Sequence, residues 1–307
     1  MIKYSAPAKV HMSGEHSVVY GKPALLTAIN YRLICTLIEK SQHPVRDGQI
    51  VKIDSIVRKH LKIHNRSIDY NIKITSDIPR GKGLGSSAAF SCALVSAIYE
   101  HYSKREASQE TISNLAYTAE KLFHANASGG DTTTSCMGGL VFFRKEFEFL
   151  KGIYTLNFKI PRVIEQRLYL IDTGKPVEKT SDMVNYIGKA YNKNPKKYER
   201  IMNEIEKTTK RMVISIVKKD AEFFSQQLRQ NQSLLTDLGV VSEKAQKLLN
   251  DISVFAVGKI TGAGGIKSGA GFALCFVNDE RGFAQYCEKH SISIIKFNQS
   301  HEGVKKL

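Results

Sequence analysis

The stretch that decides the fold is Pro79-Arg80-Gly81-Lys82-Gly83-Leu84-Gly85-Ser86-Ser87-Ala88-Ala89. The alternating segment 68–74 before it predicts a half-buried strand, and the alanine- and serine-rich segment 86–102 predicts a helix. A glycine-rich turn between a strand and a helix suits phosphate, because the backbone can approach an anion and the helix start offers N–H groups. The alternative is an ordinary turn whose helix is capped by Ser86 or Ser87, but three alternating glycines are more than such a turn needs.

This loop matches neither of the two common nucleotide-binding motifs. A Walker A motif needs Gly-x-x-x-x-Gly-Lys-Ser/Thr, and the nearest window, 261–268, has Ile266 where the second glycine is required. The dinucleotide fingerprint Gly-x-Gly-x-x-Gly fails as well, because Gly85 comes one residue early. We therefore expect a phosphate loop of a different kind.

The composition is that of a globular protein. The chain has 307 residues, of which 42% are hydrophobic and 24% charged. It contains no apolar run long enough to span a membrane, and its N-terminus does not resemble a signal peptide. The five cysteines are far apart, so we expect buried free thiols and a cytoplasmic protein.

The net charge of +16 raises the possibility of a nucleic-acid partner. The densest basic run, 189–219, mixes lysines with glutamates, and apolar residues recur between them at helical spacing. This pattern favours a solvated helix face over an RNA surface, so we expect neither a nucleic-acid nor a membrane partner.

The chain is predicted to fold as an α+β protein in two lobes. The first ~160 residues contain strands, including 23–40, and two helices over 86–102 and 108–124. The second part combines long helices over 181–252 with shorter elements, namely strands at 167–172, 254–261, 271–277 and 291–297 and a helix near 280–290.

Three further segments contain residues suited to chemistry. Lys9 lies in an apolar strand, and Glu15 and His16 follow a glycine turn, where a buried His–Glu hydrogen bond is as good an interpretation as a ligand site. Asp131 follows a Ser-Gly-Gly turn and could take a proton from a hydroxyl, or it could only cap the next segment. The segment 259–271 is a second glycine-dense loop, which is either a ligand-binding loop or a mobile hairpin.

Together, these four segments resemble the GHMP kinases in order and spacing. The loop 79–89 fits the Pro-x-x-x-Gly-Leu-Gly-Ser-Ser-Ala motif of that family, and the resemblance runs from Ser5 to Phe276. It implies a ribosomal-protein S5 domain 2-like lobe over 1–160 and a ferredoxin-like lobe over 161–307. It also implies an ATP-dependent phosphotransferase with an alcohol acceptor, which could form a homodimer.

Within the family, Gly14-Glu15-His16-Ser17-Val18-Val19-Tyr20-Gly21 resembles the mevalonate kinase branch. That branch implies transfer of the ATP γ-phosphoryl group to the 5-hydroxyl of mevalonate. Phosphomevalonate or homoserine kinase is the near alternative, and an RNA-binding protein on an S5-like fold is a remote one. The chain departs from the family at Ala8, at the polar run 11–13, at Ala127 and at 266–268, which interrupts the third glycine motif.

The resemblance also implies roles for individual residues. Asp131 is expected to be the general base, with Lys9 beside it. Mg²⁺ is expected on Ser86 or Ser87 and on Glu120. The ATP phosphates are expected on the loop Gly81, Lys82, Gly83, Leu84, Gly85, Ser86 and Ser87. The acceptor is expected to contact Glu15, His16, Thr173, Thr180 and Thr261.

Overall fold

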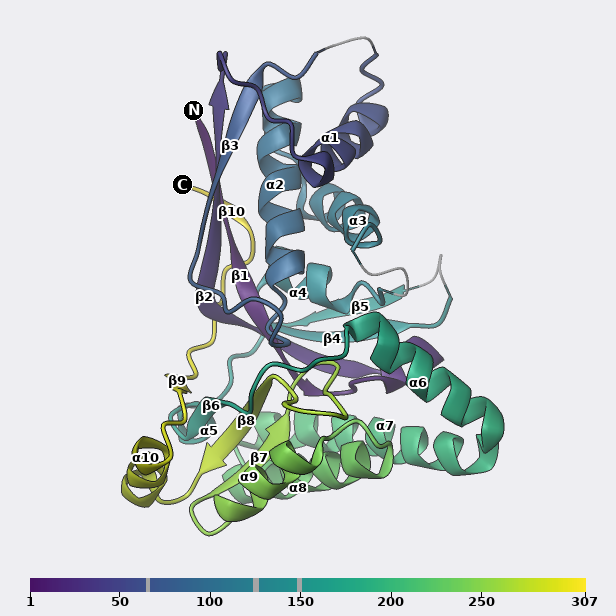
Figure 1. The fold of residues 1–307 in the computed structure, drawn as a ribbon, viewed down its shortest axis with the longest axis vertical. Helices are drawn as coiled ribbons and strands as arrows, with labels where there is room; N and C mark the ends of the chain where they lie inside the picture. The colour runs from purple at the N-terminus through teal and green to yellow at the C-terminus, as the bar shows by residue number, and fades with distance from the viewer. Residues whose placement is uncertain (65–66, 124–126, 148–150) are drawn as a thin grey trace.

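The computed structural model describes residues 1–64, 67–123, 127–147 and 151–307, which form two lobes (Figure 1). The first lobe is built on a six-stranded sheet in the order β10-β1-β2-β4-β5, with β3 also paired to β2. Its strands are β1 (Ile2–Ser13), β2 (Ala24–Glu39), β3 (Tyr70–Ser76), β4 (Leu140–Lys145), β5 (Lys151–Leu156) and β10 (Lys305–Lys306). One face carries helices α1 (Gly48–His60), α2 (Ser86–Ser103), α3 (Gln109–Glu120) and α4 (Gly130–Met137).

The second lobe contains a four-stranded sheet in the order β7-β8-β6-β9. Its strands are β6 (Leu168–Asp172), β7 (Ala256–Ile260), β8 (Phe272–Val277) and β9 (Ile294–Lys296). Its helices are α5 (Arg162–Glu165), α6 (Thr180–Lys193), α7 (Pro195–Lys218), α8 (Ala221–Asp237), α9 (Glu243–Asp251) and α10 (Glu280–Lys289). All pairings between these named strands are antiparallel, which confirms the α+β class. The chain then returns to the first lobe, where β10 pairs with β1, and the lobe boundary at 160 stays a prediction.

The two lobes share a continuous core. One cluster of buried side chains includes Val10 of β1 and Leu84 of the glycine loop together with Met212 of α7 and Phe272 of β8. In addition, the Ser13 and Thr209 hydroxyls lie 2.7 Å apart across the junction. Because these apolar contacts cross from lobe to lobe, they fix the position of the loops between them.

Two helices of the first lobe were not predicted. Helix α1 begins at Asp47, whose side chain accepts from the backbone N–H groups of Gln49 and Ile50, and it buries Ile50, Ile53 and Val57. This cap and this spacing are readable in the sequence. The other, α4, contains Thr132, Thr133 and Thr134, which favour strands, so only packing makes it helical. The end of the helix predicted over 108–124 lies partly outside the described residues, and α3 itself ends at Glu120.

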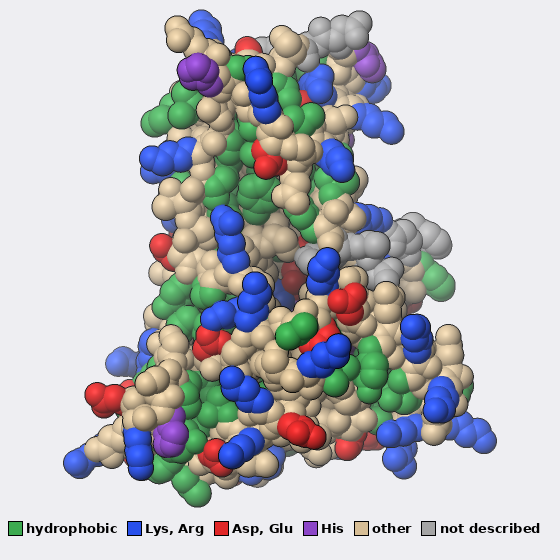
Figure 2. All heavy atoms as spheres, in the orientation of Figure 1, with side chains coloured by type: hydrophobic (Ala, Val, Ile, Leu, Met, Phe, Trp, Pro, Cys, Tyr) green, Lys and Arg blue, Asp and Glu red, His purple; other side chains and the backbone are tan. Residues whose placement is uncertain are grey.

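Basic side chains are spread over both lobes and mixed with acidic ones on the face shown in Figure 2. The basic run 189–219 covers the last residues of α6 and the whole of α7. Within α7, Lys207 pairs with Glu204 and Lys210 pairs with Glu206. This confirms the prediction of a solvated helix face. All five cysteines are buried and free, and none of the described helices has the length and apolarity to cross a membrane.

Candidate functional site

The glycine loop connects β3 to α2, as predicted. Gly81, Gly83 and Gly85 have φ angles of 70°, 87° and 74°, in the left-handed region that favours glycine. The alternative of a serine-capped turn does not hold, because Gly85 is the N-cap of α2 and no side chain caps this end. Ser86 and Ser87 instead open the helix. An end without a side-chain cap leaves its first-turn N–H groups available to an anion.

The second glycine loop packs directly against the first one. A Cβ atom on Gly83 would lie 2.6 Å from the carbonyl oxygen of Thr261, and one on Gly262 would lie 3.0 Å from the Cα of Gly83. The Phe272 N–H also donates to the Lys82 carbonyl at 3.1 Å. The two predicted ligand loops therefore meet backbone to backbone, and they do so across the lobe junction.

Lys9 and Asp131 form the centre of the site. The Lys9 backbone N–H donates to the Leu84 carbonyl at 3.0 Å, and its side chain passes over Gly85, where a Cβ would lie 2.7 Å from Lys9 Cγ. Lys9 Nζ then reaches Oδ2 of Asp131 at 3.0 Å. The other oxygen, Oδ1, lies 2.9 Å from Nε2 of His11. Each carboxylate oxygen thus has its own donor.

The electrostatics keep Asp131 ionised. Burial by itself would raise its pKa, but the charge of Lys9 and the hydrogen bond from His11 outweigh burial and hold the pKa well below its usual range. The position of Asp131 in the first turn of α4 also favours a negative charge. Its side chain is 30% exposed, so a substrate hydroxyl can reach it. The arrangement suits a proton acceptor.

Glu120 has the opposite character. Burial, together with the nearby charge of Asp131, raises the pKa of Glu120 to about 8. Its Oε1 accepts from the Ser87 hydroxyl at 3.4 Å, while its Oε2 is buried with no hydrogen-bond partner among the described residues. The nearby charge of Lys9 offsets this rise only in part, and the unpartnered Oε2 leaves room for a further positive ligand.

These groups fit a magnesium ion shared with a nucleotide. No three His, Cys, Asp or Glu side chains gather at a metal-binding spacing within the described parts of the chain. One carboxylate and one hydroxyl, completed by phosphate oxygens and water, form the site that Mg²⁺ usually takes in phosphoryl-transfer enzymes.

Glu15 and His16 lie in the turn after β1, where each makes an internal contact. Glu15 forms a fully buried ion pair with Lys259 of β7. His16 Nε2 donates to the Ala263 carbonyl at 3.0 Å, and burial lowers the pKa of His16, which favours the neutral ring. Both contacts join the first lobe to the second glycine loop.

The remaining predicted residues lie on the second lobe. The Thr173 hydroxyl donates to the Gly271 carbonyl at 2.8 Å and accepts from the Ala270 N–H at 2.9 Å. The Thr261 hydroxyl accepts from the His11 N–H at 2.9 Å. Thr180, by contrast, opens α6 with an exposed side chain, and no hydrogen bond joins it to the other candidates in the described part of the chain.

Sequence reasoning missed two residues, His11 and Lys259. In the sequence, His11 stands out only as part of the run 11–13 that departs from the family motif, and Lys259 only as the first residue of a glycine-dense loop. The sequence does contain a signal for His11. Side chains alternate between the two faces of a strand, so His11, two positions after Lys9, lies on the same face of β1 as Lys9. For Lys259 no local signal existed, since its partner Glu15 is 244 positions away in the sequence.

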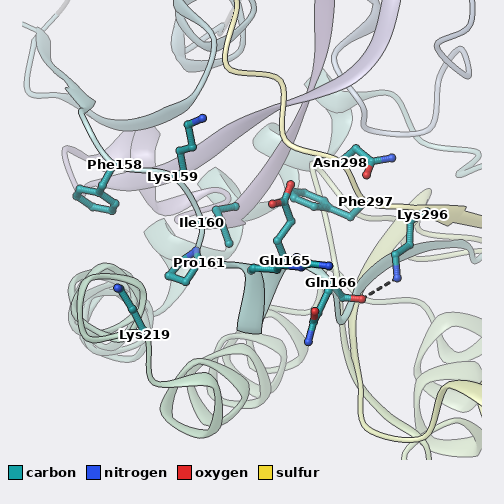
Figure 3. Close-up of a pocket in the computed structure, with 11 residues that line it drawn as sticks. Phe158, Lys159, Ile160, Pro161, Glu165, Gln166, Lys219, Lys296, Phe297 and Asn298 are labelled. Atoms are coloured by element: carbon teal, nitrogen blue, oxygen red, sulfur yellow. Dashed lines mark hydrogen bonds between the residues drawn. The ribbon is translucent and has the colours of Figure 1, made fainter.

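Two cavities lie outside this cluster. One of about 710 Å³ is lined by residues of the segment 158–166, by Lys219 and by Lys296, Phe297 and Asn298. Figure 3 shows Lys296 donating to the Gln166 carbonyl at its edge. The other, of about 860 Å³, lies beside the Val19–Tyr20 turn and α6. None of the predicted site residues lines either cavity.

Comparison with known proteins identifies the family. Residues 50–139, which contain the glycine loop, Glu120 and Asp131, match the family model described as the GHMP kinases N terminal domain. The mevalonate kinase of Pyrococcus furiosus is 32% identical over 299 residues, covering 85% of this chain and 86% of that protein. The chain belongs to the mevalonate kinase family.

Two further comparisons agree with this assignment. The family member from Methanothermobacter thermautotrophicus is 30% identical over 276 residues, covering 85% of this chain and 86% of that protein. The solved structure of the Methanococcus jannaschii mevalonate kinase has a TM-score of 0.79, covers 97% of this chain and 98% of that chain, and is 22% identical. That level of identity shows a shared fold, and the sequence relatives carry the family assignment. The resemblance expected from the motifs is therefore confirmed.

Proposed function

We propose that this member of the mevalonate kinase family transfers the γ-phosphoryl group of ATP to the 5-hydroxyl of mevalonate. The observation that carries the proposal is the ionised Asp131, held by Lys9 beside a phosphate-type loop and next to Glu120. A hydroxyl acceptor needs a proton acceptor, and this carboxylate is partly exposed while its neighbours are buried.

In the reaction, the substrate oxygen forms a bond to the γ-phosphorus while the bond to the β-phosphate bridging oxygen breaks. Asp131 accepts the hydroxyl proton, and ADP leaves with the electron pair of the broken bond. Lys9 holds Asp131 in place and stabilises negative charge that develops on the attacking oxygen. The chemistry therefore depends on positioning and charge rather than on a covalent enzyme intermediate.

Magnesium would be held by Glu120 and by Ser86 or Ser87, and it would neutralise charge on the β- and γ-phosphates. The backbone of 81–87 would bind the phosphates through the uncapped start of α2. This arrangement would also give a partner to Oε2 of Glu120, which has no hydrogen bond among the described residues.

On the acceptor side, we propose that the exposed Thr180 contacts the substrate, together with His16, whose Nε2 also donates to the Ala263 carbonyl. Glu15, Thr173 and Thr261 already make internal bonds, and we propose that they shape the pocket by fixing its loops.

A coupled ADP-release assay with mevalonate, phosphomevalonate, homoserine and galactose tests the proposal. We expect turnover with mevalonate to exceed turnover with each other acceptor by a wide margin. No turnover with mevalonate would refute it, and preference for phosphomevalonate or homoserine would support the near alternative. The RNA-binding alternative leaves the Lys9–Asp131 pair and the buried Glu120 without a role.

A further inference from the structure

His11 is a polar residue in an otherwise buried stretch of β1. Its neighbours Val10 and Met12 are fully buried, and its own side chain is 9% exposed. One ring nitrogen, Nδ1, is buried with no hydrogen-bond partner among the described residues. Burying an unpartnered polar atom costs stability, and an apolar side chain here would avoid that cost. A feature that is unfavourable for folding points to a functional role.

The other ring nitrogen of His11 has one partner, the carboxylate of Asp131. Nε2 lies 2.9 Å from Oδ1, while Lys9 Nζ occupies Oδ2 at 3.0 Å. An ionised carboxylate only accepts hydrogen bonds, so Nε2 carries the proton in this contact. Lys9 and His11 are two positions apart on one strand face and therefore hold the two oxygens of the same carboxylate.

The backbone of His11 is fixed by the second lobe. Its N–H donates to the Thr261 hydroxyl at 2.9 Å, and its carbonyl accepts from Lys259 Nζ at 3.1 Å. The β1–β2 pairing also shifts register between His11 and Ser13, a bulge of the kind that redirects side chains near active sites. The direction of the imidazole is thus set by the second glycine loop as well as by its own strand.

His11 is not placed to be the base itself. Nε2 is occupied by Asp131, and Nδ1 is buried away from solvent. Asp131 keeps the exposed surface that a substrate needs. The titratable groups around this carboxylate are Lys9 and His11 from β1 and Glu120 from α3.

We propose that His11 is a positioning residue for Asp131, donating the second hydrogen bond that fixes the carboxylate and stabilises its ionised form. The inference rests on the proposed role of Asp131 as the base. Removing the donor should free one carboxylate oxygen and make Asp131 easier to protonate, since both changes follow from the loss of one hydrogen bond.

The test compares three variants in the full chain with ATP, Mg²⁺ and mevalonate. His11→Leu removes the donor, His11→Gln keeps an N–H at a similar reach, and His11→Asn is polar but one methylene shorter. We expect kcat to fall by about 10- to 100-fold in the Leu and Asn variants, with the KM for ATP little changed and the acidic limb of the kcat/KM profile moved to higher pH. The Gln variant should recover most of the loss.

Several results would overturn the inference. A Leu variant with unchanged kcat and an unchanged pH profile would do so, as would a Gln variant as defective as the Asn variant. If the Leu variant fails to fold, the Gln–Asn comparison decides alone, because both side chains are polar. Asp131→Asn is measured in parallel. If that variant keeps its turnover, the proposed base is wrong, whereas an inactive Asp131→Asn with normal His11 variants refutes only the role of His11.

Discussion

The contact between the two glycine loops makes a quantitative prediction for Gly83→Ala. The new Cβ would lie 2.6 Å from the Thr261 carbonyl oxygen, whereas ordinary contact begins at 3.4 Å. The Thr261 oxygen belongs to the backbone and the new Cβ is fixed directly to the Gly83 backbone, so neither can rotate away and the loops must separate by about 0.8 Å. A displacement near 1 Å in an active site can cost about 10²-fold in rate. We therefore expect kcat/KM to fall by about 100-fold.

Two glycines provide matched controls for the backbone strain. Gly81 and Gly139 also have positive φ, but a Cβ on Gly81 would meet only the flexible end of Lys175 at 3.4 Å. A Cβ on Gly139 would meet nothing within 4 Å among the described residues. All three alanine variants should lose about 1–2 kcal/mol of unfolding free energy from left-handed strain. Gly83→Ala should lose a further 1–3 kcal/mol, roughly the cost of overpacking.

The assays are chemical denaturation for the free energy of unfolding and coupled ADP release for kcat/KM. The reasoning is refuted if Gly83→Ala retains the kcat/KM of Gly81→Ala, or if Gly139→Ala is the most defective of the three. Either result would mean that contact between the loops does not determine activity.

Two further predictions concern buried charges. The pKa of Glu120 is raised to about 8, so the folded chain holds this proton longer than the unfolded chain. Without Mg²⁺ and nucleotide, the unfolding free energy should therefore fall as pH rises from about 5 to 8, by up to about 1.4 kcal/mol per pH unit. Glu120→Gln should remove this trend in pH-dependent denaturation and raise the Mg²⁺ concentration needed for turnover. An unchanged slope would contradict the assignment. Lys259→Met should cost about 3–5 kcal/mol because Glu15 is left as an unpaired buried charge. The double variant with Glu15→Gln should regain much of that loss in the same denaturation measurement, and no recovery would argue against the pair.

The glycine loop and its flanking elements could be predicted because their signals are local. Alternating glycines require positive φ, and the strand before them and the helix after them each show their own periodicity. The resemblance to the GHMP kinases also implies roles for Lys9, Glu120 and Asp131. The structure brings these three together: Lys9 pairs with Asp131, and Glu120, which accepts from Ser87, lies close enough to feel both charges.

Other features depend on contacts that a single segment cannot reveal. The helix that carries Asp131 contains three consecutive threonines, so its local preference is for strand and only tertiary packing makes it helical. The Glu15–Lys259 pair joins opposite ends of the chain, and the role of His11 emerges only when α4 is packed against β1. Helix α1 is different, because its Asp47 cap and its apolar spacing are both local signals in the sequence.

The central claim is that Asp131 accepts the proton of a hydroxyl substrate while Lys9 holds it in place. The most direct measurement is single-turnover transfer from ATP to mevalonate by Asp131→Asn, with ATP binding measured on the same protein. The account predicts a loss of about 10²–10⁴-fold in the transfer rate with ATP affinity nearly unchanged. A variant that keeps more than about a tenth of the wild-type rate would contradict it.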